Sequence, residues 1–127
     1  MDMKTLVLLT AALAATPASA QVYKCRSDKG AELAVQVGDN RLAMHDGRKV
    51  TLLCGRGAAP AKCGRTTDGG YAYAGALGMI QFVPESRVFG APAVFQVRAP
   101  GEGAWTKYVC LVADARVRRV FQTTRSF

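Results

Sequence analysis

Residues that could carry acid–base chemistry are few in this sequence and form no catalytic set. His45 is the only histidine in the 127 residues, and Asp46 follows it. Adjacent residues on a strand point to opposite faces, so these two do not make a dyad. The serines lie in no nucleophile elbow, and most acidic residues fall in expected turns, which leaves no evident carboxylate pair. We therefore expect no enzymatic activity and no cofactor.

Cysteine is the next residue type that could form bonds or bind a metal. The chain has four cysteines, which allow three disulfide pairings: Cys25, Cys54, Cys63 and Cys110. Zinc binding would favour closely spaced Cys-x-x-Cys pairs or added histidines, and neither is present, so we expect no metal. Two disulfides in an exported protein are the favoured interpretation. Among the pairings we favour Cys25–Cys110, which would join the first and last strands, and Cys54–Cys63.

Basic residues dominate the charge of the chain, which has a formal net charge of +8. Such a surface favours acidic partners or simply keeps a small protein soluble. The densest basic patch is near the end of the chain, and its members are Arg116, Arg118, Arg119 and Arg125. This patch would bind anionic glycan or lipid headgroups, or it would discourage pairing at a sheet edge.

The first twenty residues have the pattern of a signal peptide. Lys4 precedes an apolar run at residues 6–15, and small residues at Ala18 and Ala20 predict cleavage before Gln21. The run is too short for a transmembrane helix, which needs about 20 apolar residues. We expect a periplasmic, secreted or surface-exposed protein, for which nucleic acid is not a partner.

Short apolar or alternating runs, separated by glycine, proline and aspartate, predict the elements that position these residues. We find no period of 3.6 long enough for a helix, so the pattern favours an antiparallel all-β domain. About eight strands indicate a small closed β-barrel over residues 21–112 or a tight sandwich, and we favour the barrel. The expected strands are residues 21–27, 31–37, 41–45, 48–54, 70–76, 77–83, 93–98 and 105–112.

Several details of this prediction stay open. Residues 70–83 form two strands or one long strand bent at a bulge. Asp46-Gly47 predicts a hairpin turn of type I′. Residues 113–127 form a basic tail or a further strand. The chain ends in Phe127, and a terminal aromatic residue is also a feature of outer-membrane β-barrels. The expected strands, however, are shorter than the roughly 9–11 residues that such barrels use.

The order of these features resembles the MliC/PliC group of bacterial C-type lysozyme inhibitors, in particular the neisserial adhesin complex protein branch. The resemblance covers roughly residues 22–112 and implies a small antiparallel barrel of about eight strands. The residues that carry it are Tyr23-Lys24-Cys25, Asp46-Gly47, Asp68-Gly69-Gly70-Tyr71, Gly75, Pro92 to Val97, Ala99-Pro100 and Cys110.

The resemblance implies that a loop plugs the lysozyme cleft through a Ser-Gly-x-x-Tyr motif and a later Tyr-x-x-Gly strand with a lysine. Residues 63–67 stand at the first motif, where cysteine replaces serine and threonine replaces tyrosine, and residues 71–75 stand near the second and contain no lysine. The expected contact residues are Lys62, Gly64, Arg65, Thr66, Thr67, Asp68, Tyr71 and Tyr73. Expected alternatives are an adhesin that binds anionic glycan or a host membrane through its basic face, and a structural module. A homodimer is also possible.

Overall fold

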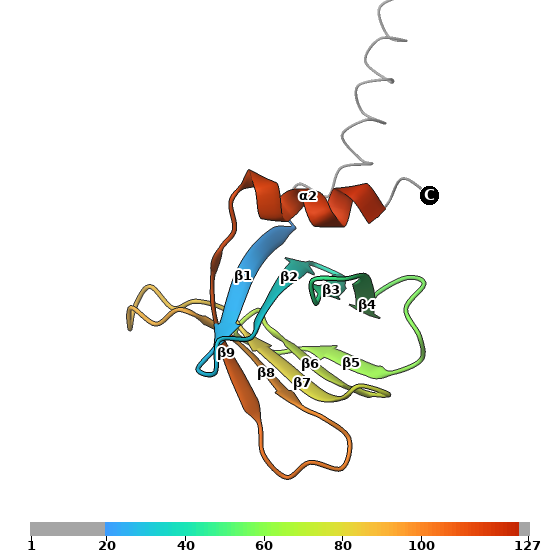
Figure 1. Cartoon of the computed structure of the whole chain (residues 1–127). Coiled ribbons are helices and arrows are strands. Elements are labelled where there is room, and N and C mark those ends of the chain that lie inside the picture. The colour runs from blue at the N-terminus through green and yellow to red at the C-terminus, as the bar shows by residue number, and fades with distance from the viewer. Residues whose placement is uncertain (1–19, 125–127) are drawn as a thin grey trace, which may run out of the picture.

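The computed structural model describes residues 20–124, so the predicted signal peptide and Arg125 lie outside the described part of the chain. Nine strands are followed by one helix, labelled α2 (Figure 1). The strands are β1 (Gln21–Ser27), β2 (Glu32–Gly38), β3 (Arg41–His45), β4 (Val50–Cys54), β5 (Lys62–Arg65), β6 (Tyr71–Gly75), β7 (Gly78–Val83), β8 (Ala93–Arg98) and β9 (Thr106–Val112), and α2 spans Ala115–Thr124.

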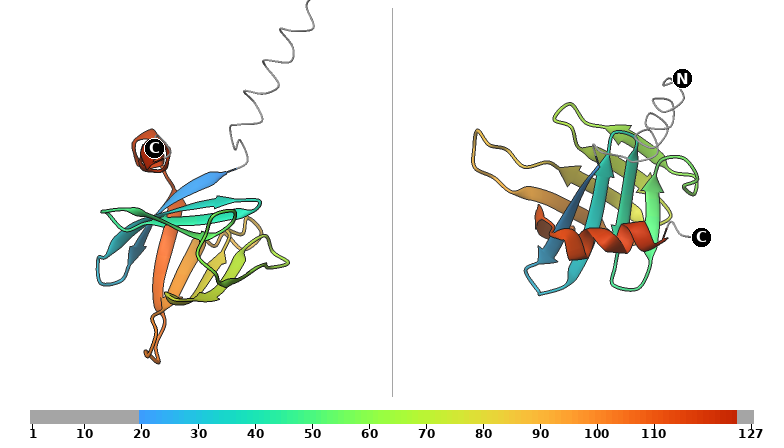
Figure 2. Two further views of the ribbon diagram at one scale, coloured as in Figure 1. Left: turned by 90° about the vertical axis from the view of Figure 1, so that its right-hand side faces the viewer. Right: turned by 90° about the horizontal axis from the view of Figure 1, so that it is seen from above.

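All nine strands belong to one antiparallel sheet, in the order β4-β3-β2-β1-β9-β8-β7-β6-β5. The sheet curls until its two end strands, β4 and β5, approach each other, which makes a nearly closed barrel (Figure 2). The all-β barrel prediction is therefore confirmed. Among the described strands, β4 and β5 are the neighbours without a backbone ladder between them, and we call this gap the seam.

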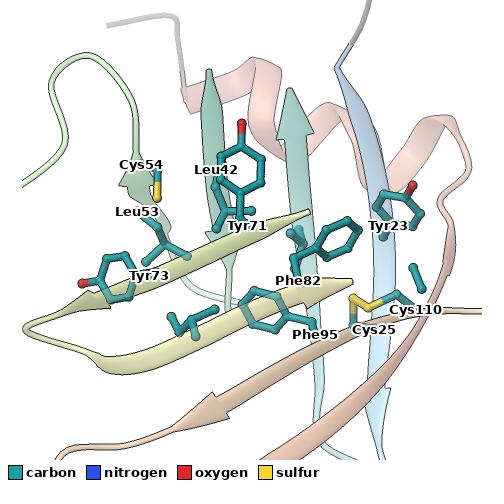
Figure 3. Packing of buried hydrophobic residues seen from close by; sticks show 13 residues of the cluster. Tyr23, Cys25, Leu42, Leu53, Cys54, Tyr71, Tyr73, Phe82, Phe95 and Cys110 are labelled. Atoms are coloured by element: carbon teal, nitrogen blue, oxygen red, sulfur yellow. A yellow bond between two sulfur atoms is a disulfide. The ribbon is translucent and has the colours of Figure 1, made fainter. Parts of the chain in front are cut away.

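Alternation along the strands places one set of side chains inside the barrel (Figure 3). Aromatic rings fill most of the interior, and the rings of Tyr23 and Phe82 lie 5.2 Å apart. Phe82 and Phe95 are almost completely buried. Burial of such rings is the main favourable term that a domain of this size has available.

Both favoured disulfides are present. Cys25 and Cys110 are paired directly across β1 and β9, so their bond reinforces a ladder that already exists. Cys54 ends β4 and Cys63 lies in β5, so the second bond crosses the seam. Disulfides are typical of proteins that fold outside the cytoplasm.

The expectation of a tail or strand after residue 112 is wrong, because residues 115–124 form a helix. The Asp114 carboxylate accepts a hydrogen bond from the Val117 amide at 3.1 Å, which caps the first turn. Val117, Val120 and Phe121 have the i, i+3, i+4 spacing of one helix face. They pack on the outer face of the sheet over Val22, Ala34 and Ala43, and α2 crosses β1 to β4 (Figure 2).

Three smaller expectations are resolved. Residues 71–83 form two strands, β6 and β7, not one bent strand. Residues 62–65, expected within a loop, form β5 beside β6. The turn after His45 is not type I′, since positive φ is found at Gly47 but not at Asp46. Instead the Asp46 carboxylate accepts hydrogen bonds from the amides of Arg48 and Lys49.

None of the helical segments within residues 20–124 has both the length and the apolar character needed to cross a bilayer.

Candidate functional site

The candidate site is the turn of the β5–β6 hairpin, residues 66–70, which we call the hairpin turn. Two backbone hydrogen bonds close it, from the Thr66 amide to the Gly70 carbonyl at 3.1 Å and from the Gly69 amide to the Thr66 carbonyl at 3.0 Å. The Thr66 hydroxyl donates to the Asp68 carboxylate and accepts from the Gly70 amide at 2.8 Å. The turn is therefore ordered by its own polar groups before any partner binds.

The charge of Asp68 is part of this network. The Thr66 hydroxyl, and after it the Gly70 amide, lower the pKa of the Asp68 carboxyl below its ordinary value. Both groups donate to the ionised form and so favour it. Asp68 thus carries a negative charge at neutral pH at the exposed tip of the hairpin.

Two adjacent glycines are needed in the hairpin turn for different reasons. Gly69 has φ +90°, a conformation that other residues rarely adopt. A Cβ on Gly70 would lie 2.0 Å from the Phe82 carbonyl oxygen of β7. Gly70 therefore lets the turn lie close against the neighbouring strand.

Arg65 is held by the protein itself. Its guanidinium donates to the carbonyls of Gly70 at 3.1 Å and Gly69 at 2.9 Å on its own hairpin. It also donates to the Asp39 carbonyl at 2.5 Å, in the turn between β2 and β3. Its Cζ atom lies 4.6 Å from the centre of the Tyr71 ring. These contacts use the planar fork of arginine to link the hairpin with the opposite side of the seam.

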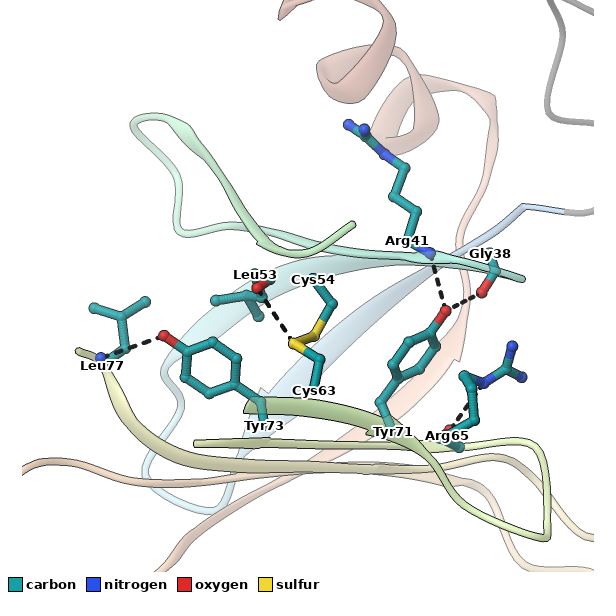
Figure 4. The surroundings of a disulfide bond; sticks show 10 residues. Gly38, Arg41, Leu53, Cys54, Cys63, Arg65, Tyr71, Tyr73 and Leu77 are labelled. Atoms are coloured by element: carbon teal, nitrogen blue, oxygen red, sulfur yellow. Dashed lines mark hydrogen bonds between the residues drawn. A yellow bond between two sulfur atoms is a disulfide. The ribbon is translucent and has the colours of Figure 1, made fainter. Parts of the chain in front are cut away.

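Tyr71 and Tyr73 face the interior and are 3% and 7% exposed. The Tyr71 hydroxyl donates to the Gly38 carbonyl and accepts from the Arg41 amide at 3.0 Å, which adds a second link across the seam (Figure 4). Neither ring is placed to contact a partner in this conformation. The shared face that alternation assigns to the two tyrosines is the inner face.

The expected contact residues therefore divide into two groups. Arg65, Tyr71 and Tyr73 hold the hairpin in place. Arg65 is itself exposed, but its guanidinium is engaged by carbonyl groups of the protein. The other exposed residues of the set are Lys62, Gly64, Thr66, Thr67 and Asp68. Since Cys63 and Arg65 are directed toward the seam, Lys62 and Gly64 lie on the outer face of β5.

The basic patch also has a defined position. Arg116, Arg118 and Arg119 are exposed on α2, whose apolar face packs on the sheet. Arg125 is beyond the described residues. A helix that displays arginines on its outer side forms a fixed cationic surface.

His45 connects the sheet with α2. Its ring lies edge-on to Phe121 with centres 6.3 Å apart, and its Nδ1 accepts a hydrogen bond from the Gly47 amide at 3.2 Å. Within residues 20–124, no group of three or more His, Cys, Asp or Glu side chains is placed to hold a metal ion.

A second exposed surface, which is apolar, was not predicted from the sequence. The β7–β8 loop, residues 84–92, displays Val88 and Phe89 at its tip, 86% and 85% exposed. The signal in the sequence was an apolar pair between Arg87 and Gly90, inside a segment that otherwise has the residues of a turn.

We compared the chain with known protein families, curated proteins and solved structures, and none of them matches it.

Proposed function

We propose that this chain is an exported, non-catalytic binding protein that inhibits C-type lysozyme through the hairpin turn and the adjoining outer face of β5. The observation that carries the proposal is that an exposed hairpin on one side of the barrel seam is attached to the strands on the other side. The Cys54–Cys63 bond and the Arg65 contact with Asp39 join it to β4 and to the β2–β3 turn.

A hairpin held in this way suits inhibition by insertion into a cleft. Binding is weakened by the entropy lost when a loop becomes ordered, and a preformed turn has already lost it. In this proposal the contacts come from the exposed group. The Lys62 ammonium supplies the cation and the Thr67 hydroxyl a hydrogen-bonding group, while Arg65 and Tyr71 keep the turn in position.

Export is the second part of the proposal. The predicted signal peptide at residues 1–20 and the two disulfides both support a location outside the cytoplasm. C-type lysozymes act there, and they are themselves strongly basic. Repulsion from a chain with net charge +8 lowers the association rate, so inhibition is expected to improve with moderate salt.

The test is a bacterial cell-wall turbidity assay with purified protein and C-type lysozyme at physiological salt. We expect stoichiometric inhibition by the wild type and its loss in the double variant Lys62→Glu, Thr67→Glu. Lys49→Glu is the charge-reversal control, because Lys49 is also exposed but lies in the β3–β4 turn. No inhibition at large molar excess would exclude lysozyme as the target. Full inhibition by the double variant would exclude the hairpin as the contact.

A second candidate function is an adhesin that binds anionic glycan or a host membrane through α2. The observation in its favour is the exposure of Arg116, Arg118 and Arg119 on one helix. Binding to immobilised heparin is then expected to fall steeply with salt, as counterion release requires. Replacing the three arginines by glutamine would abolish retention, whereas the matched triple variant at Lys29, Arg48 and Lys49 would preserve most of it. Equal losses in both variants would show that net charge alone is responsible.

A further inference from the structure

The tip of the β7–β8 loop presents two apolar side chains that the rest of residues 20–124 leaves largely uncovered. Its end residues are paired by two hydrogen bonds, from the Ser86 amide to the Ala91 carbonyl at 2.9 Å and in the reverse direction at 3.0 Å. The Ser86 hydroxyl accepts from the Phe89 amide at 3.3 Å. Exposed Val88 and Phe89 are therefore held outward by a preformed turn, which projects from the barrel (Figure 1).

The base of this loop is anchored to the core. The Glu85 carboxylate accepts a hydrogen bond from the Tyr23 hydroxyl at 2.8 Å. Tyr23 itself is buried, and its ring packs on Phe82. Such an anchor means that the apolar tip keeps its position relative to the barrel, as a contact surface requires.

A groove of about 1150 Å³ begins where the loop ends. Pro92, the last residue of the loop, lines it, and its floor is the outer face of β9 with Val109 and Leu111. Val112 and Val117 extend the apolar lining toward α2. Leu111 is 69% and Val112 55% exposed, so the groove offers apolar surface that no part of residues 20–124 covers.

The charges around the groove indicate what kind of group it accepts. Four basic and four acidic side chains line it: Lys24, Arg26, Lys29, Lys107, Asp28, Glu32, Glu102 and Asp114. A site for a polyanion would be lined by one sign of charge. A mixed rim over an apolar floor instead suits a short apolar segment with a single charged neighbour, and Arg87-Val88-Phe89 has that composition.

We propose that two copies of this chain pair about a twofold axis, with the β7–β8 loop of each copy seated in the groove of the other. Loop and groove are adjacent because Pro92 belongs to both, so one twofold operation buries both surfaces at once. Phe89 is the anchor that enters the groove, and Arg87 pairs with one of the acidic side chains that line it. The loop and groove share no residue with the hairpin turn, so the pairing is independent of lysozyme inhibition.

Insertion of the tip into a membrane is the other use of such a loop. Stable membrane attachment needs a second signal beside a small apolar tip, usually a basic patch. The arginines of α2 lie on a different side of the barrel from the loop, so one flat membrane does not meet both (Figures 1 and 2). The structure therefore favours pairing of copies.

Sedimentation velocity over a concentration series tests the proposal on the purified chain. We expect a reversible dimer, a dissociation constant raised at least about 100-fold by Phe89→Asp, and a similar effect of Leu111→Asp. Leu77→Asp is the matched control, because Leu77 is an exposed apolar residue in the β6–β7 turn, outside both surfaces. Phe89→Asp and Leu111→Asp should keep the wild-type melting temperature, since the replaced side chains are 85% and 69% exposed.

A mixture of the two variants gives the sharpest result. The Phe89→Asp copy keeps an intact groove and the Leu111→Asp copy an intact loop, so mixing them restores one of the two contacts and produces heterodimers. Added salt should leave the dimer intact or strengthen it, because both copies carry +8. A monomer at every concentration, or a dimer unaffected by Phe89→Asp, would overturn the proposal. So would a monomer whose binding to anionic vesicles depends on Phe89.

Discussion

The Arg65 guanidinium on β5 donates a hydrogen bond to the Asp39 carbonyl in the β2–β3 turn, 26 residues away in the chain. This contact crosses the seam between β4 and β5, the end strands of the described sheet, which no backbone ladder joins. Together with the Tyr71 hydroxyl and the Cys54–Cys63 bond, it replaces the missing ladder with side-chain links. The hairpin proposed to bind lysozyme is thus held by the contacts that close the barrel.

Removal of the seam hydrogen bonds is expected to cost stability. Tyr71→Phe leaves the Gly38 carbonyl and the Arg41 amide without this partner and should lower the free energy of unfolding by about 1–2 kcal/mol. Arg65→Lys keeps the charge but loses the planar guanidinium, and we expect the free energy of unfolding to fall by about 1 kcal/mol. Urea unfolding measures both values, with Lys49→Ala as the control. Unchanged stability in both variants would show that the seam does not depend on these groups.

Removal of the seam disulfide separates stability from inhibition. Cys54 and Cys63 are 9 residues apart, and the chain-entropy model assigns a loop of this size about 2.5 kcal/mol. The double variant Cys54→Ser, Cys63→Ser should lose about that much and still fold, because Cys25–Cys110 remains. Inhibition of lysozyme should be measured at a temperature where the variant is fully folded. The double cysteine variant should then inhibit less well than the Lys49→Glu control. Unaltered inhibition would show that the hairpin needs no covalent support.

Acid should loosen the hairpin turn. Folding lowers the pKa of the Asp68 carboxyl from its ordinary 3.8, so the ionised form stabilises the folded state. This contribution is complete above the unfolded-state pKa and is lost as the pH falls through the lower folded-state value. Asp68→Asn should therefore be less stable than wild type at pH 7, and the difference should shrink as the pH falls below the ordinary pKa of 3.8. A constant difference from pH 7 to pH 2 would contradict this origin.

The contact of α2 with the sheet is testable at Phe121, which is 2% exposed. Phe121→Ala removes the largest side chain between helix and sheet and should cost about 3–5 kcal/mol. Arg118→Ala, on the exposed side of the same helix, is the control and should change stability little. Thermal unfolding followed by circular dichroism measures both. An equal, small effect of the two variants would mean that the helix contributes little to the barrel.

Local sequence was sufficient to predict most strands and the two disulfides. Alternation along residues 21–27 and 93–98, and turn residues between the runs, reflect backbone preferences that act within a few residues. The pairing of Cys25 with Cys110 followed once the first and last strands were expected to be neighbours. The helix was missed because a ten-residue segment with two valines, one phenylalanine and three arginines also fits a strand, and its docking on the sheet decided the outcome.

The sequence by itself favoured an antiparallel barrel, two disulfides and a polar connection before residue 70, whereas the tertiary structure showed that residues 62–65 pair with β6 as strand β5. Alternation placed Tyr71 and Tyr73 on one face but did not distinguish the inner face from the outer one, because both faces obey the same period. Arg65 was assigned to a partner because its contact with Asp39 exists only after the sheet has curled. The tertiary structure alone showed which side chains remain exposed, including Phe89 on the β7–β8 loop, because exposure depends on segments far apart in the chain.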